Sequence, residues 1–145
     1  MKRSILPVLL LAAAALLTAA ASHPFSPEEC AGRRSELMAA AGEGLIILFG
    51  ETDAPAGARF RQDNDFFYLT GCDDRGAVLV MLAARRESHL FLPEQGPREI
   101  MVEGANLLGR EGAASGRRLT RVAGLSALDE FLARQMRMAR PILHA

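Results

Sequence analysis

Apolar residues first recur at helical spacing after residue 25. Ser26-Pro27-Glu28-Glu29 places a capping serine, a proline at the first helical position and a glutamate three residues after the cap. The apolar positions that follow are Cys30, Leu37, Met38 and Ala41, with Arg33 and Glu36 turned to solvent. The pattern predicts a helix that begins after Ser26 and ends at the glycines Gly42 and Gly44.

Shorter apolar runs follow this helix. Leu45–Phe49 is a continuous apolar run stopped by Gly50, which predicts a strand buried on both faces. Glu51 to Arg59, rich in Gly, Pro and Asp, predicts a loop. Further strands are predicted at Phe66–Thr70, Ala77–Ala83 and His89–Leu92.

The last third of the chain carries weaker signals. Arg98–Gly116 is ambiguous, because glycines interrupt its helical pieces. Ser126 to Asp129 predicts a second capped helix that runs to about Ala139, and Pro141–Leu143 has the pattern of another strand. Together the elements predict one α/β domain with a mixed sheet flanked by helices, and 145 residues are enough for one core.

The first 21 residues have the pattern of a secretory signal peptide. Lys2 and Arg3 precede an apolar stretch, Ile5–Leu17, and Ala19–Ala21 supplies the small residues of a cleavage site. A membrane anchor is the alternative, but the apolar stretch is short for a span. We therefore expect export to the periplasm or the medium, with residues 22–145 as a mature domain that has no membrane attachment.

Charge and histidine spacing exclude several function classes. The chain has 17 basic and 17 acidic side chains, which argues against a nucleic-acid partner. His23, His89 and His144 stand alone, so no metal site is expected, and His89 is interpreted as a surface or satisfied residue at the head of a strand. Cys30 and Cys72 leave two alternatives open, a disulfide or two buried apolar residues.

The stretch FRQDNDFFYLTG, Phe60 to Gly71, is the densest in reactive side chains. Asp63 and Asp65 could act as an acid and base, because neighbouring carboxylates separate their pKa values. They could equally cap a turn, with Arg61 as counter-ion. The aromatic residues around them are core-forming types, and this favours the structural interpretation.

These residues resemble the N-terminal domain of Xaa-Pro aminopeptidases (aminopeptidase P). The resemblance includes Arg33-Arg34-x-x-Leu37 in the first helix, and then Leu92-Pro93, Glu99-Ile100-x-x-x-Gly104 and Gly109-x-x-Gly112-Ala113. It runs from about Pro27 to the end of the sequence. It implies a scaffold role, without catalysis, for Phe60, Arg61, Gln62, Asp63, Asp65, Tyr68 and Gly71. Met101 stands where the family usually has tryptophan, so the resemblance makes it a candidate wall of a substrate pocket.

Enzymes of this family release the residue that precedes a proline. The resemblance places their chemistry in a C-terminal catalytic domain, where two metal ions, commonly manganese, activate water. It therefore implies that this chain has no catalytic residue and no metal ligand, and that it binds peptide only together with a catalytic domain. We expect the truncated front part of an exported aminopeptidase, inactive alone, whose partners are that catalytic domain and further copies in a homo-oligomer.

Two alternatives remain open. The chain could be a free-standing, non-catalytic binding or regulatory module of the same fold. It could also be an unrelated small enzyme that uses Asp63 and Asp65.

Overall fold

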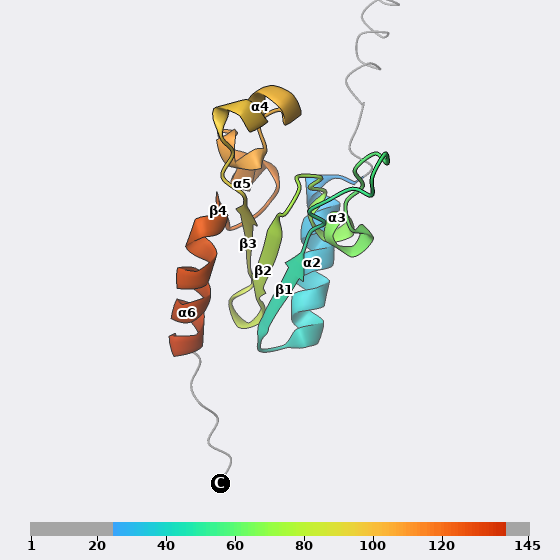
Figure 1. The fold of residues 1–145 in the computed structure, drawn as a ribbon. Coiled ribbons are helices and arrows are strands. Elements are labelled where there is room, and N and C mark those ends of the chain that lie inside the picture. The colour runs from blue at the N-terminus through green and yellow to red at the C-terminus, as the bar shows by residue number, and fades with distance from the viewer. Residues whose placement is uncertain (1–24, 139–145) are drawn as a thin grey trace, which may run out of the picture.

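A four-stranded mixed sheet lies at the centre of the molecule (Figure 1). The structure, a computed structural model, describes residues 25–138. The strands β1 and β2 pair antiparallel, β2 and β3 pair antiparallel, and β3 and β4 pair parallel. The elements in chain order are α2 (Pro27–Ala41), β1 (Leu45–Phe49), α3 (Asn64–Thr70), β2 (Val78–Leu82), β3 (Glu87–Leu92), α4 (Pro97–Glu103), α5 (Ala113–Gly116), β4 (Arg121–Gly124) and α6 (Leu128–Met138), with short 3₁₀ turns at Ala83–Arg85, Leu107–Gly109 and Leu125–Ala127. The predicted mixed α/β fold is confirmed.

The two faces of the sheet carry separate apolar layers. Because side chains alternate along a strand, Leu79 and Met81 of β2 face the layer that contains Met38 and Phe66 of α2 and α3. Their neighbour Val80 belongs to the other layer, beneath α6. Figure 1 shows α2 and α6 on opposite sides of the strands. All five residues of β2 are buried, as its central position requires.

The first helix begins as predicted. The N–H of Glu29 donates to the hydroxyl of Ser26 (3.1 Å), and the N–H of Ser26 donates to the carboxylate of Glu29 (2.7 Å). This reciprocal pair satisfies two N–H groups that the helix itself leaves without a partner. Cys30 and Met38 are buried, as expected. Arg33 is half-buried, because its guanidinium lies on two aromatic rings, so its predicted exposure to solvent is correct only in part.

The predicted strand Phe66–Thr70 is wrong, since these residues form the short helix α3. Asp63 caps the helix by accepting from the N–H of Phe66 (2.9 Å), and Gly71 ends it in the left-handed conformation at φ 61°. Aromatic residues favour strands only weakly, and here the two end signals determine the structure.

The strand β1 is present, but its predicted burial on both faces is wrong. Leu45 and Phe49 are exposed, and the three residues between them are half-buried. The reason is its place in the sheet, because β1 lies at one edge and β2 is its only partner among the described strands. The strand β4 at the other edge was not predicted.

The C-terminal helix exists, but it begins at Leu128, without the predicted cap from Ser126. The hydroxyl of Ser126 donates instead to the carboxylate of Glu94, and its N–H donates to the same oxygen (3.2 Å). These bonds tie the start of α6 to the end of β3, and they hold the pKa of Glu94 below its usual range.

The predicted signal peptide and the predicted strand Pro141–Leu143 lie outside the described residues.

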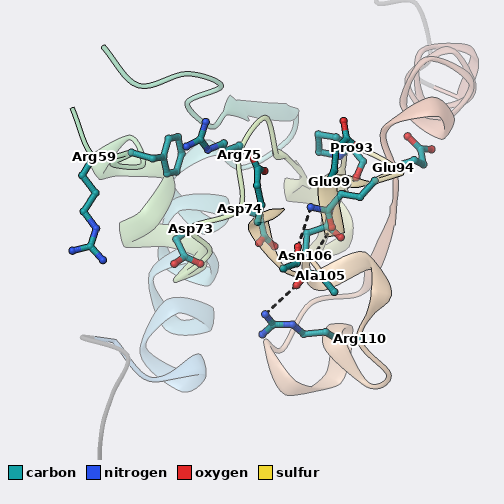
Figure 2. A pocket seen from close by; sticks show the side chains of 14 residues that line it. Arg59, Asp73, Asp74, Arg75, Pro93, Glu94, Glu99, Ala105, Asn106 and Arg110 are labelled. Atoms are coloured by element: carbon teal, nitrogen blue, oxygen red, sulfur yellow. Dashed lines mark hydrogen bonds between the residues drawn. The ribbon is translucent and has the colours of Figure 1, made fainter. Parts of the chain in front are cut away.

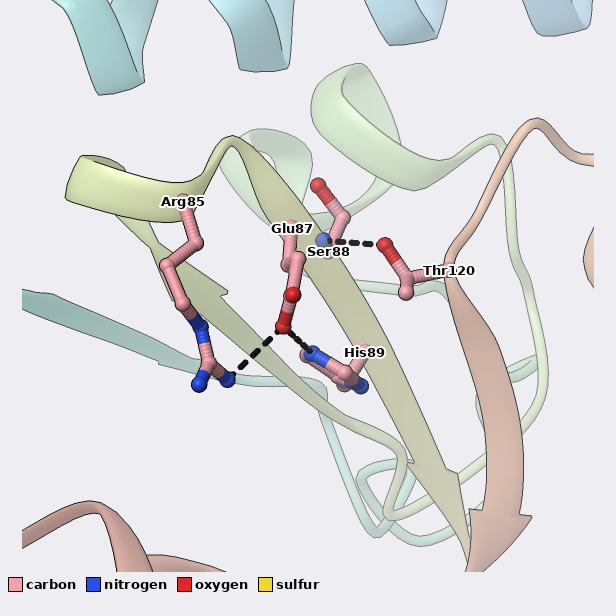
Figure 3. Close-up of polar contacts among 5 residues, drawn as sticks. All are labelled: Arg85, Glu87, Ser88, His89 and Thr120. Carbon is pink, nitrogen blue, oxygen red and sulfur yellow. Dashed lines mark hydrogen bonds and ion pairs between the residues drawn. The ribbon is translucent and has the colours of Figure 1, made fainter. Parts of the chain in front are cut away.

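His89 lies inside β3, not at its head, and the prediction of a surface or satisfied residue was wrong in part. Its ring is buried against Phe131 of α6, with 4.7 Å between the ring centroids. Its Nε2 lies 3.1 Å from the carboxylate of Glu87, which also pairs with Arg85 (Figure 3). Its Nδ1 has no hydrogen-bond partner within the described part of the chain. Burial therefore lowers the pKa of His89 from its ordinary value, against the raising effect of Glu87.

No helix between residues 25 and 138 combines the length and the apolar character that crossing a bilayer requires.

Candidate functional site

The carboxyl end of α3 lies within a group of arginine side chains. Arg33 donates to the carbonyl oxygen of Tyr68 (3.0 Å), and Arg34 donates to that of Leu69 (2.7 Å). Arg117 donates to the carbonyl oxygen of Thr70 (3.3 Å) and to that of Gly71. The last carbonyl groups of a helix have no partner within the helix and carry its negative dipole end, so cations stabilise them.

Arg34 is the most buried member of this group, with 1% of its surface exposed. Its second terminal nitrogen donates to the carbonyl oxygens of Arg117 (3.1 Å) and Arg118 (2.7 Å). Burial lowers the pKa of the Arg34 guanidinium from its ordinary value, but an arginine retains its charge over the physiological range. One side chain of α2 thus joins α3 to the turn before β4.

Arg33 connects the same helices at the surface. Its guanidinium carbon lies 4.1 Å from the centroid of the Phe25 ring and 3.9 Å from that of Tyr68. The two rings meet edge to face at 5.8 Å. A cation held on aromatic faces is stabilised by the negative charge density of the rings.

Gln62 is the buried polar residue of the FRQ segment. Its side-chain oxygen accepts from the N–H groups of Glu51 (2.5 Å) and Asp63 (2.9 Å), and its nitrogen donates to the carbonyl oxygen of Asp74 (2.9 Å). Both ends of the amide are therefore satisfied. Gln62 thus joins the two ends of the loop between β1 and α3 to the loop between α3 and β2.

The two aspartates of the motif have different environments. Asp63 is the cap of α3, whereas Asp65 is exposed in the first turn of that helix. Arg61 donates to the side-chain oxygen of Asn64 (3.2 Å) and forms no ion pair with either aspartate among the described contacts. The arrangement supports the capping interpretation of Asp63.

A cavity of about 630 Å³ opens beside this motif (Figure 2). It is bounded by the residues before α3, the loop between α3 and β2, and the segment from the end of β3 through α4 to the following turn. Its lining residues are Arg59, Phe60, Asp73, Asp74, Arg75, Pro93, Glu94, Gln95, Glu99, Glu103, Gly104, Ala105, Asn106 and Arg110.

Asp74 and Asn106 hold the base of this cavity in place. The carboxylate of Asp74 accepts from the N–H of Leu107 (2.9 Å). Asn106 donates to the carbonyl oxygen of Pro93 (2.8 Å), and its own N–H donates to Gln95 (2.8 Å). The shape of the cavity is therefore maintained by hydrogen bonds between loops.

Cys30 and Cys72 are both free and buried in the structure. Burial, with the nearby Asp74 carboxylate, raises the pKa of the Cys72 thiol to about 12. Burial likewise raises the pKa of Cys30. A thiol needs its anionic form to act as a nucleophile, so neither cysteine has the environment of a reactive one.

Side chains that could bind a metal ion form no cluster in the described part of the chain. Between residues 25 and 138, no three His, Cys, Asp or Glu side chains are grouped so that they could hold an ion. These residues therefore do not fit a pair of metal ions, and the resemblance places the two-metal site in a C-terminal domain. Met101 lies on α4 with 80% of its surface exposed, and it does not line the cavity.

Several residues at this site were not identified from the sequence. Arg34 is part of the quoted family motif, but its role was not predicted. Arg117 and Asn106 were not predicted as site residues. For Arg34 a signal existed, since it lies one turn after Cys30 and one turn before Met38 on the buried face of α2. For Arg117 and Asn106 no local signal exists, because their partners lie far away in the chain.

Comparison with known proteins defines the family. The model of "Aminopeptidase P, N-terminal domain" matches residues 30–143. The chain belongs to this family.

Two curated relatives give the same picture. The chain is 32% identical over 124 residues to "Intermediate cleaving peptidase 55, mitochondrial" of Arabidopsis thaliana, which covers 81% of this chain and 24% of the relative. It is 35% identical over 77 residues to "Probable Xaa-Pro aminopeptidase pepP" of Penicillium rubens, covering 50% of this chain and 17% of that protein. The chain thus spans a quarter or less of the curated relatives that it matches.

The fold matches solved structures of aminopeptidase P from Escherichia coli. One of them, in complex with substrate, has a TM-score of 0.64 at 25% identity and covers 76% of this chain and 27% of that enzyme. The zinc-substituted enzyme in complex with product has a TM-score of 0.61 at 24% identity, which shows the shared fold. The match again covers only part of the longer protein.

Proposed function

We propose that the chain is the N-terminal, non-catalytic domain of an exported Xaa-Pro aminopeptidase. The proposal rests on the residues of the family motifs. Arg33 and Arg34 of α2 donate to the last carbonyl groups of α3, and Gln62 binds the loops on either side of that helix. Arg33, Arg34 and Gln62 each donate to backbone carbonyl groups. A domain built in this way can support a neighbouring active site, and the relatives' names supply the reaction.

Catalysis then belongs to a domain outside these 145 residues. The described residues do not fit a metal pair, so we place the two metal ions, manganese by analogy with the family, in that partner domain. Such ions polarise a peptide carbonyl and supply hydroxide at neutral pH. In this proposal the present domain acts as a wall of the substrate entrance and as a surface for oligomer formation.

A domain exchange tests the proposal. Residues 25–138 would replace the matching segment of Escherichia coli aminopeptidase P, and turnover of a neutral Xaa-Pro peptide would be compared with that of the parent enzyme and of its catalytic domain alone. We expect the chimera to be soluble and to recover turnover above the isolated catalytic domain. A folded chimera no more active than the isolated catalytic domain would contradict the proposal and would favour the free-standing module.

Export requires its own test. Residues 1–24 would be fused to a reporter enzyme that is active only after disulfide formation outside the cytoplasm. The signal pattern predicts reporter activity and a shortened product, and exchange of Lys2 and Arg3 for glutamate should lower both. Full-length reporter retained without activity would contradict export.

A further inference from the structure

The strand β1 is an open edge of the sheet without the features that normally protect such an edge. No segment of the described chain pairs with its outer side, since β2 is its one neighbour in the sheet. Its residues, Leu45–Phe49, are all apolar, with no charge and no proline among them. At the opposite edge, β4 is shorter and carries Arg121. Short strands and edge charges hinder the addition of a foreign strand, so β1 is the more accessible edge.

Hydrogen bonds at the two ends of β1 show which of its backbone groups face outward. The carbonyl oxygen of Gly44 accepts from the N–H of Ala83 (3.0 Å), and the N–H of Gly50 donates to the carbonyl oxygen of Ala77 (2.7 Å). Bonded and non-bonded pairs alternate along an antiparallel ladder, so the even-numbered residues between these glycines also bond β2. The N–H and C=O groups that point away from β2 belong to the odd-numbered residues, Leu45, Ile47 and Phe49.

The same three residues carry apolar side chains that the molecule leaves partly uncovered. Because side chains alternate along a strand, all three lie on the face of the sheet where Ile47 packs against the layer beneath α6. Figure 1 shows α6 toward the β4 side of the sheet, with β1 on the other side. Leu45 is accordingly 40% exposed and Phe49 is 69% exposed. Outward backbone groups and exposed apolar side chains thus occur at the same positions.

We propose that β1 pairs antiparallel with β1 of a second copy of this chain, which joins the two sheets into one. The outward residues are symmetric about Ile47, so a pair centred there matches Ile47 with Ile47 and Leu45 with Phe49. This register provides a partner for the outward N–H and C=O groups of all three residues in both copies. It also brings the exposed apolar side chains against one another, and both copies use the same surface, as a two-fold contact requires.

The size and charge of the edge set the strength of this contact. A stable dimer of free proteins covers about 800 Å² on each partner, and one short strand covers less. Glu43 and Glu51 are exposed beyond the two ends of β1, and the register directs Glu43 of one copy toward Glu51 of the other. Like charges at opposite positions oppose pairing. We therefore expect a reversible dimer that forms as the protein concentration rises. The inference rests on the proposed function in giving its oligomer surface a place in the fold.

Sedimentation of the purified protein over a range of concentrations tests the association. We expect a monomer–dimer equilibrium that Phe49→Lys weakens about tenfold, because it places a charge opposite Leu45 of the second copy. Met136→Lys is the matched control, since Met136 is 67% exposed on α6, outside the proposed contact. A chain that stays monomeric at millimolar concentration, or equal effects of the two substitutions, would overturn the proposal.

Single cysteines introduced into β1 test the register. Ile47→Cys should form a disulfide between two copies in oxidised glutathione, because opposite residues of a bonded pair have Cα atoms about 5.5 Å apart. Phe49→Cys is the control, since the register places Phe49 opposite Leu45 and far from its own copy. The native Cys30 and Cys72 are buried. No crosslink in Ile47→Cys, or an equally fast one in Phe49→Cys, would contradict this pairing.

Removal of the end charges should have the opposite effect on the dimer. Salt should strengthen association of the unmodified chain by screening Glu43 and Glu51. The double variant Glu43→Gln/Glu51→Gln should associate more tightly at low salt and respond less to added salt. Weaker association of this variant, or an unchanged response to salt, would contradict the register.

Failure of this inference can be distinguished from failure of the proposed function. The domain exchange measures turnover, whereas sedimentation measures association of this chain without a catalytic domain. An active chimera, together with a chain that stays monomeric, would retain the proposed function and reject the contact at β1.

Discussion

The buried guanidinium of Arg34 joins backbone segments that are far apart in the sequence. It donates to carbonyl groups of Leu69, Arg117 and Arg118. Removing it would leave buried acceptors without donors, and hydrogen bonds to charged groups contribute about 1.5–3 kcal/mol each. We therefore treat this residue as a main determinant of how α2, α3 and the turn before β4 are held together.

Replacement of Arg34 by methionine should lower the free energy of unfolding by about 2–3 kcal/mol, because the apolar side chain cannot satisfy those carbonyl groups. Urea denaturation measures the change. Arg61→Met is the matched control, since Arg61 is exposed and bonds only Asn64 in the described structure. Equal effects of the two substitutions would contradict the assigned role of Arg34.

The two motif aspartates give a second comparison at this scale. Asp63→Ala should cost about 1 kcal/mol, because it removes the cap of α3. Asp65→Ala should cost no more than about 0.5 kcal/mol, since an exposed acid in the first turn interacts only with the helix dipole. Thermal unfolding of both variants measures the difference. A larger loss from Asp65→Ala would contradict the capping assignment and reopen an active role for that residue.

At the scale of elements, Gly71 ends α3 in a backbone conformation that favours glycine. Its φ is 61°, and a Cβ there would lie 2.9 Å from Nη1 of Arg117. Gly71→Ala should therefore cost the left-handed strain of about 1 kcal/mol and, in addition, displace Arg117. Gly57→Ala is the control, because Gly57 has φ 78° but open space around it. Equal unfolding free energies would show that Arg117 does not contact Gly71 in solution.

The packing of α6 on the sheet should depend on pH through His89. Burial lowers the folded-state pKa of His89, so the unfolded chain, near its ordinary value of about 6.5, binds the proton first. Stability should be full above that value and fall as pH drops through it toward the lowered folded pKa.

Charged groups around His89 include Glu87 and Arg85, whose pair adjoins its Nε2, and Arg121 on β4. Replacement of His89 by glutamine should flatten the fall in unfolding free energy between pH 7.5 and pH 5, measured by urea denaturation. An unchanged pH profile in this variant would show that another group causes the dependence.

The sequence patterns predicted the elements whose signals are local. The capped start of α2 and the three apolar strands follow from residues adjacent in the chain, as at Ser26 and Glu29. Phe66–Thr70 was assigned to a strand because aromatic propensity was given more weight than the end signals at Asp63 and Gly71. The edge position of β1 depends on which strands pair, and no pattern within five residues encodes it.

The candidate site was predictable only in outline. The motif pointed to the correct region, but Gln62 also binds Asp74 beyond α3, and the partners of Arg34 and Arg117 lie in other loops and helices. The cavity likewise forms from segments before α3, after α3 and around α4, and side-chain types in one segment do not reveal which others face it. Long-range contacts of this kind depend on the tertiary structure, so local sequence patterns do not predict them.

At the scale of the whole molecule, Arg33, Arg34 and Gln62 bind backbone groups of segments other than their own helix or turn. The family match and the arginines around α3 support one account. In the proposed function, the domain shapes an active site and a partner domain supplies the chemistry.

A peptidase assay of the purified protein tests that account most directly. The 145-residue chain, or its form shortened after Ala21, would be incubated with manganese and an Xaa-Pro peptide, with Escherichia coli aminopeptidase P as the positive control. The account predicts no release of the first residue above a blank without protein. Metal-dependent release that increases with the concentration of this chain would contradict it.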